Sequence, residues 1–188
     1  MLVDDASHGV AGPLYDGLIT AGYEVVAVAN DARSLLERVA VDSPDVIIIA
    51  SDSPTRDTLE QLAFVTARQP RPIVLFTEDG ESGTIQAALR AGVSAYIVDG
   101  THPERLKPIL DVAVARFERD RELREELESA HARLAERKLI ERAKGLVMRQ
   151  KGVDEEEAFR LMRRLAMDRN RRLVEVAQQI IDVADLMG

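Results

Sequence analysis

Short runs rich in β-branched residues alternate with amphipathic, helical patterns through the first 115 residues of the chain. Runs of this kind, separated by helices, pair into parallel sheets with helices on both faces. The expected strands are Met1–Val3, Glu24–Ala29, Asp45–Ala50, Ile73–Phe76 and Ser94–Val98. The pattern therefore predicts an α/β domain over residues 1–115, built on a doubly wound, five-stranded parallel sheet.

The carboxyl ends of the strands meet at one edge of such a sheet, where ligand and catalytic sites form. Mostly polar residues follow the expected strands at this edge. They are Asp4, Asp5, Ala50, Asp52, Thr77, Tyr96 and Asp99. Any site of the first domain is expected among them.

This set resembles the site of a response-regulator receiver domain, which has a flavodoxin-like fold. Asp4 and Asp5 match the acidic pair that holds Mg²⁺ in receivers. Thr77, at the end of IVLFT, matches the switch hydroxyl, and Tyr96, in AYIVDG, matches the switch aromatic residue. The resemblance covers residues 1 to 115 and implies a receiver-like domain.

Two positions depart from the receiver pattern. Ala50, four residues before Pro54, stands where receivers have the phosphoacceptor aspartate, and Asp99 stands where they have the phosphate-binding lysine. Phosphoryl transfer needs a carboxylate nucleophile and positive charge near the phosphoryl oxygens. We therefore expect a pseudo-receiver that is not phosphorylated. Asp52 is a poor substitute acceptor, because the chain is leaving the strand there.

Enzyme activity and a tightly held cofactor are not expected. Asp4, Asp5 and Asp99 offer hard oxygen ligands for a weak Mg²⁺ site, and a merely solvated acidic rim explains them equally well. His8, His102 and His131 lack the spacing of metal ligands, and no glycine-rich phosphate loop follows a strand. The adjacent aspartates also differ from the alternate pair of aspartate-nucleophile phosphatases.

Composition indicates a globular protein of the cytoplasm. Hydrophobic residues make up 46% of the 188 residues, enough for a real core, and cysteine is absent. The longest apolar run, Val46–Ala50, is far too short to cross a bilayer, and no leader precedes it. We expect no membrane association.

A long helix is expected to join the first domain to the rest of the chain, over residues 104–138. No glycine or proline occurs between Ile109 and Lys144, a span of roughly 50 Å as a helix. An apolar seam at three-and-four spacing runs along it, and its register shifts near Asp120 and Arg124. The seam residues are Ile109 or Leu110, Ala113, Phe117, Leu123, Leu127, Ala130 and Leu134. The seam predicts a parallel coiled-coil homodimer; a helix folded back over the first domain is the alternative.

Residues 135–188 predict a small three-helix domain. Gly152 suits the end of the first helix, Asp154 with Glu157 forms a capping box for the second, and Asn170 suits the N-cap of the third. The expected core residues are Leu139, Ile140, Ala143, Leu146 and Val147, then Ala158, Leu161, Met162, Leu165 and Ala166, then Leu173, Val176, Ala177, Ile180, Ile181 and Ala184.

The stretches IERAKGLVM, EEEAFRLMRRLAMDRNRRL and EVAQQII resemble the ANTAR domain, an RNA-binding antitermination module. The resemblance implies binding to a two-stem-loop element in a leader transcript, which prevents a terminator hairpin from forming. The residues expected to contact RNA are Arg142, Lys144, Arg149, Arg163, Arg164, Arg169, Asn170, Arg171 and Arg172. Residues 131–188 carry 13 basic against 10 acidic residues, whereas residues 1–130 carry 12 against 23, so the positive charge is local.

The whole chain, with DSPTRDTLEQL, RAGVSAYIVDG and ERLKPILDVAVARF, resembles NasT-type regulators of nitrate and nitrite assimilation. That resemblance implies a nitrate-sensing partner protein that holds the regulator inactive. Two other classes remain open from the residues alone. A DNA-binding transcription factor would place a recognition helix in the major groove, and a protein-interaction module would use the helices without nucleic acid.

Overall fold

The computed structural model describes the chain except for residues 6–10, 30–34, 100–101 and 188. His8, considered above as a metal ligand, lies outside the described residues. The described chain divides into two compact units, Met1–Arg121 and Glu122–Gly188. The helix α5 (Pro103–Lys151) contributes to both. Each unit is described separately below.

The first unit contains a parallel sheet of five strands in the order β2-β1-β3-β4-β5. The order and direction confirm the predicted doubly wound architecture. The strands are β1 (Leu2–Asp4), β2 (Val28–Ala29), β3 (Ile47–Ala50), β4 (Ile73–Thr77) and β5 (Ala95–Val98).

The second strand is much shorter than the predicted Glu24–Ala29. As the edge strand, β2 pairs only with β1, in the register Leu2↔Val28 and Val3↔Ala29. Since β1 is itself three residues long, it offers few backbone groups for β2 to pair with. β1 is short for a central strand, and a hydrogen bond at its beginning helps to hold it in place. The N-terminal ammonium donates to the Val46 carbonyl over 2.9 Å.

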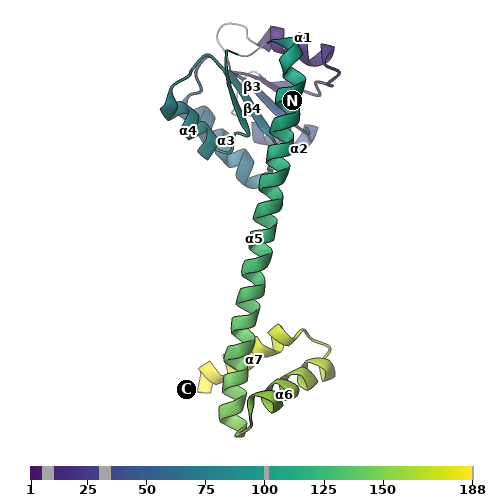
Figure 1. The fold of residues 1–188 in the computed structure, drawn as a ribbon, viewed down its shortest axis with the longest axis vertical. Helices are drawn as coiled ribbons and strands as arrows, with labels where there is room; N and C mark the ends of the chain where they lie inside the picture. The colour runs from purple at the N-terminus through teal and green to yellow at the C-terminus, as the bar shows by residue number, and fades with distance from the viewer. Residues whose placement is uncertain (6–10, 30–34, 100–101, 188) are drawn as a thin grey trace. The chain divides into compact units, whose positions relative to one another are not determined.

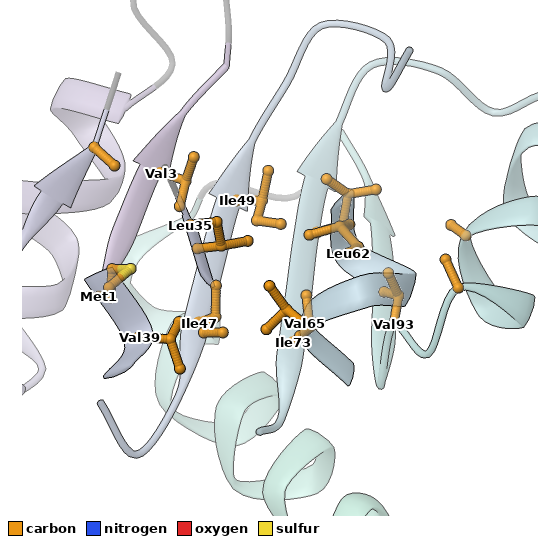
Figure 2. Close-up of a cluster of buried hydrophobic side chains, with 14 of the residues drawn as sticks. Met1, Val3, Leu35, Val39, Ile47, Ile49, Leu62, Val65, Ile73 and Val93 are labelled. Atoms are coloured by element: carbon orange, nitrogen blue, oxygen red, sulfur yellow. The ribbon is translucent and has the colours of Figure 1, made fainter. Parts of the chain in front are cut away.

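Alternate strand residues point to opposite faces of the sheet, and each face has its own core. On one face, side chains of β1, β3 and β4 pack against Leu35 and Val39 of α2 (Leu35–Asp42) and Leu62 and Val65 of α3 (Arg56–Arg68), as Figure 2 shows. α4 (Ser82–Arg90) adds Ala88 to the same cluster.

The opposite face is covered by α1 (Ala11–Thr20) and the beginning of α5. The buried helix residues there are Leu14, Leu18, Leu106, Leu110 and Ala113. With helices on both faces, the sheet leaves its carboxyl edge as the place where polar side chains gather.

The second unit contains the remainder of α5, α6 (Glu155–Asp168) and α7 (Leu173–Met187). Its small core is formed by Ala143 of α5, Met162 of α6, and Ala177 and Ile181 of α7, with partly buried neighbours from the predicted stripes. The prediction is wrong for one core residue, Leu161, whose side chain is 37% exposed. The buried positions of α6 fall in a narrow stripe with a spacing of four, because α5 and α7 cover only one side of it.

Two of the three predicted helix ends are confirmed. Gly152 adopts a φ of +65° after α5, and the Asp154 carboxylate accepts a 2.8 Å hydrogen bond from the Glu157 amide at the start of α6. The prediction that Asn170 is the N-cap of α7 is wrong, because α7 begins at Leu173.

Asn170 instead ends α6. Its φ is +49°, its amide donates to the Met167 carbonyl, and the Arg171 amide donates to the Ala166 carbonyl. This is the Schellman arrangement, whose left-handed position usually takes glycine and, less often, asparagine. In the described part of the chain, no helix is both long and apolar enough to cross a membrane.

Candidate functional site

The acidic pair lies at the carboxyl edge of the sheet, as expected. Asp4 is the last residue of β1, and Asp5 follows it. The Asp5 carboxylate accepts a 2.7 Å hydrogen bond from the hydroxyl of Thr58, a buried residue in the first turn of α3. One oxygen of the pair is therefore already engaged with the protein.

Ala50 ends β3 and is completely buried. It lies between Asp4 of β1 and Phe76 of β4 in the sheet register. Its methyl group belongs to the apolar core on the side of α1 and α5. This position supplies no group that could accept a phosphoryl group.

The expected weak Mg²⁺ site would have to be formed by the acidic residues at this edge. Within the described residues, no group of three or more His, Asp or Glu side chains could hold a metal ion. Asp99 is exposed and follows β5 with a φ of +53°. Asp4 and Asp5 alone would leave most ligand positions of a Mg²⁺ ion to water, which describes a weak site.

Thr77 and Tyr96 lie in a hydrogen-bond network that joins the loops after β3 and β4. The Thr77 hydroxyl donates to the Asp52 carbonyl over 2.9 Å and accepts from the Asp79 amide over 3.1 Å. The Tyr96 hydroxyl donates to the Asp79 carbonyl over 2.8 Å. Burial raises the pKa of the Tyr96 phenol.

Asp79 is a residue that the sequence analysis missed. Its carboxylate accepts hydrogen bonds from the Glu81 amide and the Ser53 hydroxyl, each 2.8 Å long. These bonds, the Glu81 amide first, lower the pKa of the Asp79 carboxyl. In the sequence, the signal for such a role was an aspartate in the loop between β4 and α4. In the structure, the N-cap residue of α4, Glu81, makes no side-chain cap. These hydrogen bonds join the loops at the carboxyl edge of the sheet to each other, so the polar groups named here are already bonded within the protein.

Three of the basic residues expected to bind RNA hold the second unit together. Arg142 of α5 pairs with Asp185 of α7 at 2.8 Å, and Arg172 pairs with Glu136 at 2.6 Å. Lys144 is 8% exposed, and its ammonium lies 2.6 Å from a carboxylate oxygen of Glu141 and of Glu155. Hydrogen bonds to these two carboxylates raise the pKa of Lys144. The charge of Lys144 is thus neutralised inside the fold.

Other basic residues of the set face solvent without such pairing. Arg149, Arg163 and Arg171 are exposed, and none forms an ion pair with another described residue. Arg164 approaches Asp168 at 3.9 Å, and Arg169 donates to the Gln179 side chain at 3.5 Å, which are long contacts between exposed groups. Asn170 is exposed between α6 and α7.

Of the unpaired arginines, Arg163 lies beside an aromatic side chain on α6. Phe159, Arg163 and Met167 recur every four residues on the side of α6 away from the core, and Phe159 is 38% exposed. They line an open hollow of about 570 Å³ together with Arg160, Arg164, Glu156 and Asp168. Arg160 pairs with Glu157 and Arg164 approaches Asp168, so Arg163 is the arginine of this hollow that has no ion pair with another described residue. We call Phe159, Arg160, Arg163, Arg164 and Met167 the α6 outer face. The sequence analysis did not single out Phe159 and Met167 as site residues. Both are apolar and fall outside the predicted apolar stripe of α6, which was the signal that could have identified them.

The second unit can therefore offer guanidinium groups to phosphates and an aromatic ring to a flat partner.

Residues 1–111 match the response regulator receiver domain family, and residues 128–181 match the ANTAR domain family. The fold and these matches define a response regulator, with a receiver domain followed by a helical output domain.

Relatives narrow the class. Transcriptional regulatory protein PdtaR from Mycobacterium tuberculosis is 33% identical over 161 residues, which cover 86% of this chain and 78% of PdtaR. The chain belongs to the ANTAR-domain response regulators. The nitrate regulatory protein of Klebsiella oxytoca is 44% identical over 61 residues, which cover 32% of this chain and 15% of that protein.

A solved structure has the same fold as the first unit. The signal receiver domain of a modulated diguanylate cyclase from Desulfovibrio desulfuricans G20 superposes with a TM-score of 0.55 at 20% identity, covering 63% of this chain and 95% of that one. At this identity the likeness shows the receiver fold alone.

Proposed function

We propose that the protein is an RNA-binding antitermination regulator, which binds stem-loop RNA in a nascent leader transcript through its ANTAR domain. The observation that carries the proposal is the α6 outer face, where Phe159 lies beside exposed arginines. Because a nascent transcript is the target, the protein acts in the cytoplasm.

The chemistry of the α6 outer face suits RNA loops. Proteins that recognise a specific RNA sequence mostly bind unpaired bases, which stack on aromatic rings, while lysines and arginines neutralise the flanking phosphates. Arg163 needs to break no ion pair within the described chain before it meets a phosphate. Phe159 has an exposed ring for a base.

The receiver-like domain is proposed to receive a signal from a protein rather than from a phosphoryl group. Ala50 provides no nucleophile, and the network around Thr77 and Tyr96 already satisfies their hydroxyls. A nitrate-sensing protein that restrains the regulator is the proposed partner, and genes of nitrate and nitrite assimilation are the proposed targets. The likeness to the nitrate regulatory protein of Klebsiella oxytoca supports the proposed targets, whereas the partner rests on the resemblance of the chain to NasT-type regulators.

A mobility-shift titration of the full chain tests the proposal. The probes are a two-stem-loop RNA, the same RNA with altered loops, and duplex DNA of equal length, each at two salt concentrations. We expect tight binding to the intact RNA only. The double variant R163Q/R171Q should lower that affinity by about 10- to 100-fold, since two charged contacts are lost.

The matched control is R56Q/R90Q, which removes the same charge from exposed arginines of the receiver-like domain. Its RNA affinity should equal that of the unchanged protein. Equal affinity for duplex DNA would favour a DNA-binding factor, and binding to none of the probes would favour a protein-interaction module.

A further inference from the structure

A cavity of about 510 Å³ opens at the amino edge of the sheet, the edge opposite to Asp4, Thr77 and Tyr96. It lies within the first unit, between the segments that lead into β2 and β3, the end of α1 and the first turns of α5. Its volume falls in the range of about 300–1,000 Å³ that is typical of small-molecule sites. The proposed function makes no use of this edge.

The walls of the cavity are apolar. Leu18 of α1, Ile48 of β3 and Leu110 of α5 are buried residues of the core on this face of the sheet, and each also lines the cavity. Val25 and Val46, which line it as well, are partly buried against the same core. The apolar core therefore continues into a hollow, where the apolar part of a ligand would be removed from water.

The rim of the cavity is acidic. Its carboxylates are all exposed, and they belong to Glu24, Asp45, Asp111 and Glu118. Glu24 and Glu118 form no ion pair with another described residue. Two cations at this edge are engaged by the protein: Lys107 lies 3.0 Å from the Asp111 carboxylate, and the Met1 ammonium donates to a backbone carbonyl. Four carboxylates against two cations leave the rim negative.

Tyr23 adds an aromatic ring to the lining. Its hydroxyl donates to Asp111 over a long 3.4 Å. Burial, followed by the charge of Asp111, raises the pKa of the Tyr23 phenol, so this group stays neutral at neutral pH. Aromatic rings attract organic cations, and carboxylates attract them by charge. Apolar walls, an aromatic ring and an acidic rim together suit an ammonium group that carries an apolar chain.

We propose that the cavity binds a small organic ammonium ion, with its apolar part against Leu110 and its charge among the carboxylates of the rim. An anionic ligand would meet like charges there, and a neutral one would gain nothing from them. Leu110, Val114 and Glu118 belong to α5, so a bound ligand contacts the helix that continues into the second unit. The proposal concerns the first unit and stands apart from RNA binding.

Ligand-observed NMR titrations of the full chain with hexylammonium, hexanol and hexanoate test the chemical class of the ligand. The three probes share one chain length and differ in charge. We expect hexylammonium to bind about 5- to 20-fold more tightly than hexanol, because several carboxylates attract it, and hexanoate to bind least. Added salt should reduce the difference between hexylammonium and hexanol. Equal affinities for these two probes, or binding of none of the three, would overturn the proposal.

Exposed residues allow the rim to be changed without altering the core. E24Q/E118Q removes two carboxylates and should weaken hexylammonium binding by about 3- to 20-fold, while hexanol binding stays the same. The matched control E37Q/E81Q removes the same charge from exposed glutamates outside the cavity, and it should bind hexylammonium like the unchanged protein.

Hydrogen exchange locates the bound probe. Hexylammonium should slow the exchange of backbone amides in residues 23–26 and 110–118, which contribute to the lining of the cavity. Slower exchange only in other segments, or equal weakening of hexylammonium binding in E24Q/E118Q and E37Q/E81Q, would place the binding outside the cavity and overturn the proposal.

Discussion

The side chain of Phe159 gives the proposed RNA site its sharpest test at the scale of one residue. Stacking of a base on an aromatic ring contributes about 1–3 kcal/mol, so F159A should weaken binding to the intact stem-loop RNA by about 5- to 150-fold. F159Y keeps the ring and should bind nearly as well. The readout is the same mobility-shift titration.

V183A is the matched control for Phe159, since Val183 is an exposed apolar residue of α7. It should leave RNA affinity unchanged. Hydrogen exchange of α6 should be alike in all three variants, which shows that the fold is intact. Unchanged RNA affinity in F159A, with the fold intact, would remove Phe159 from the site.

Which basic residues are free could not be predicted from the sequence. Arg142 and Arg163 both lie on predicted polar helix faces, yet Arg142 pairs with Asp185, 43 positions away in the chain. Lys144 can pair with Glu141 on α5 itself, but Glu155 reaches it only after α6 folds back against α5. Partners so distant follow from tertiary packing, and periodicity carries no information about them.

At the scale of elements, the carboxyl edge of the sheet decides how the first domain can be switched. By the resemblance to receivers, Ala50 and Asp99 stand where a nucleophile and a positive charge are expected. We expect the protein to gain no phosphoryl mass when incubated with acetyl phosphate and Mg²⁺. A50D should also remain unmodified, since Asp99 leaves the phosphoryl oxygens without a positive partner. Intact-protein mass spectrometry is the measurement.

The double variant A50D/D99K restores both groups and serves as the positive control. It should gain one phosphoryl group on a measurable fraction of the chains. Modification of the unchanged protein would show that another carboxylate accepts the group, with Asp52 the first to replace. Modification of A50D alone would show that the charge at Asp99 does not matter.

Elements were predictable where local chemistry fixes them. The buried strands β3 and β4 follow from β-branched runs, and Gly152 and Asp154 mark helix ends because their chemistry is local. β2 was predicted too long, since its pairing depends on the length of β1. Asn170 was assigned to the wrong helix end because asparagine suits both an N-cap and a left-handed C-terminal position.

At the scale of the whole molecule, the modest charge of the ANTAR domain gives the expected dimerisation a consequence for RNA affinity. The positive charge of residues 131–188 is modest, so one ANTAR domain should bind RNA with moderate affinity. In the dimer expected from the apolar seam of α5, two ANTAR domains would bind two stem-loops of the same RNA, with a high effective concentration for the second contact.

L127K, which places a charge in the apolar seam of α5, should therefore affect two-stem-loop and single-stem-loop RNA differently. At protein concentrations where the variant is monomeric, its affinity for the two-stem-loop RNA should fall by about 10-fold or more, because the second contact is lost. Its affinity for a single stem-loop should change little, and L127I, which keeps an apolar side chain, should bind both RNAs like the unchanged protein. Mobility-shift titration with the two RNAs is the measurement. An equal loss on both RNAs, or no loss on either, would mean that dimerisation through the seam adds nothing to binding.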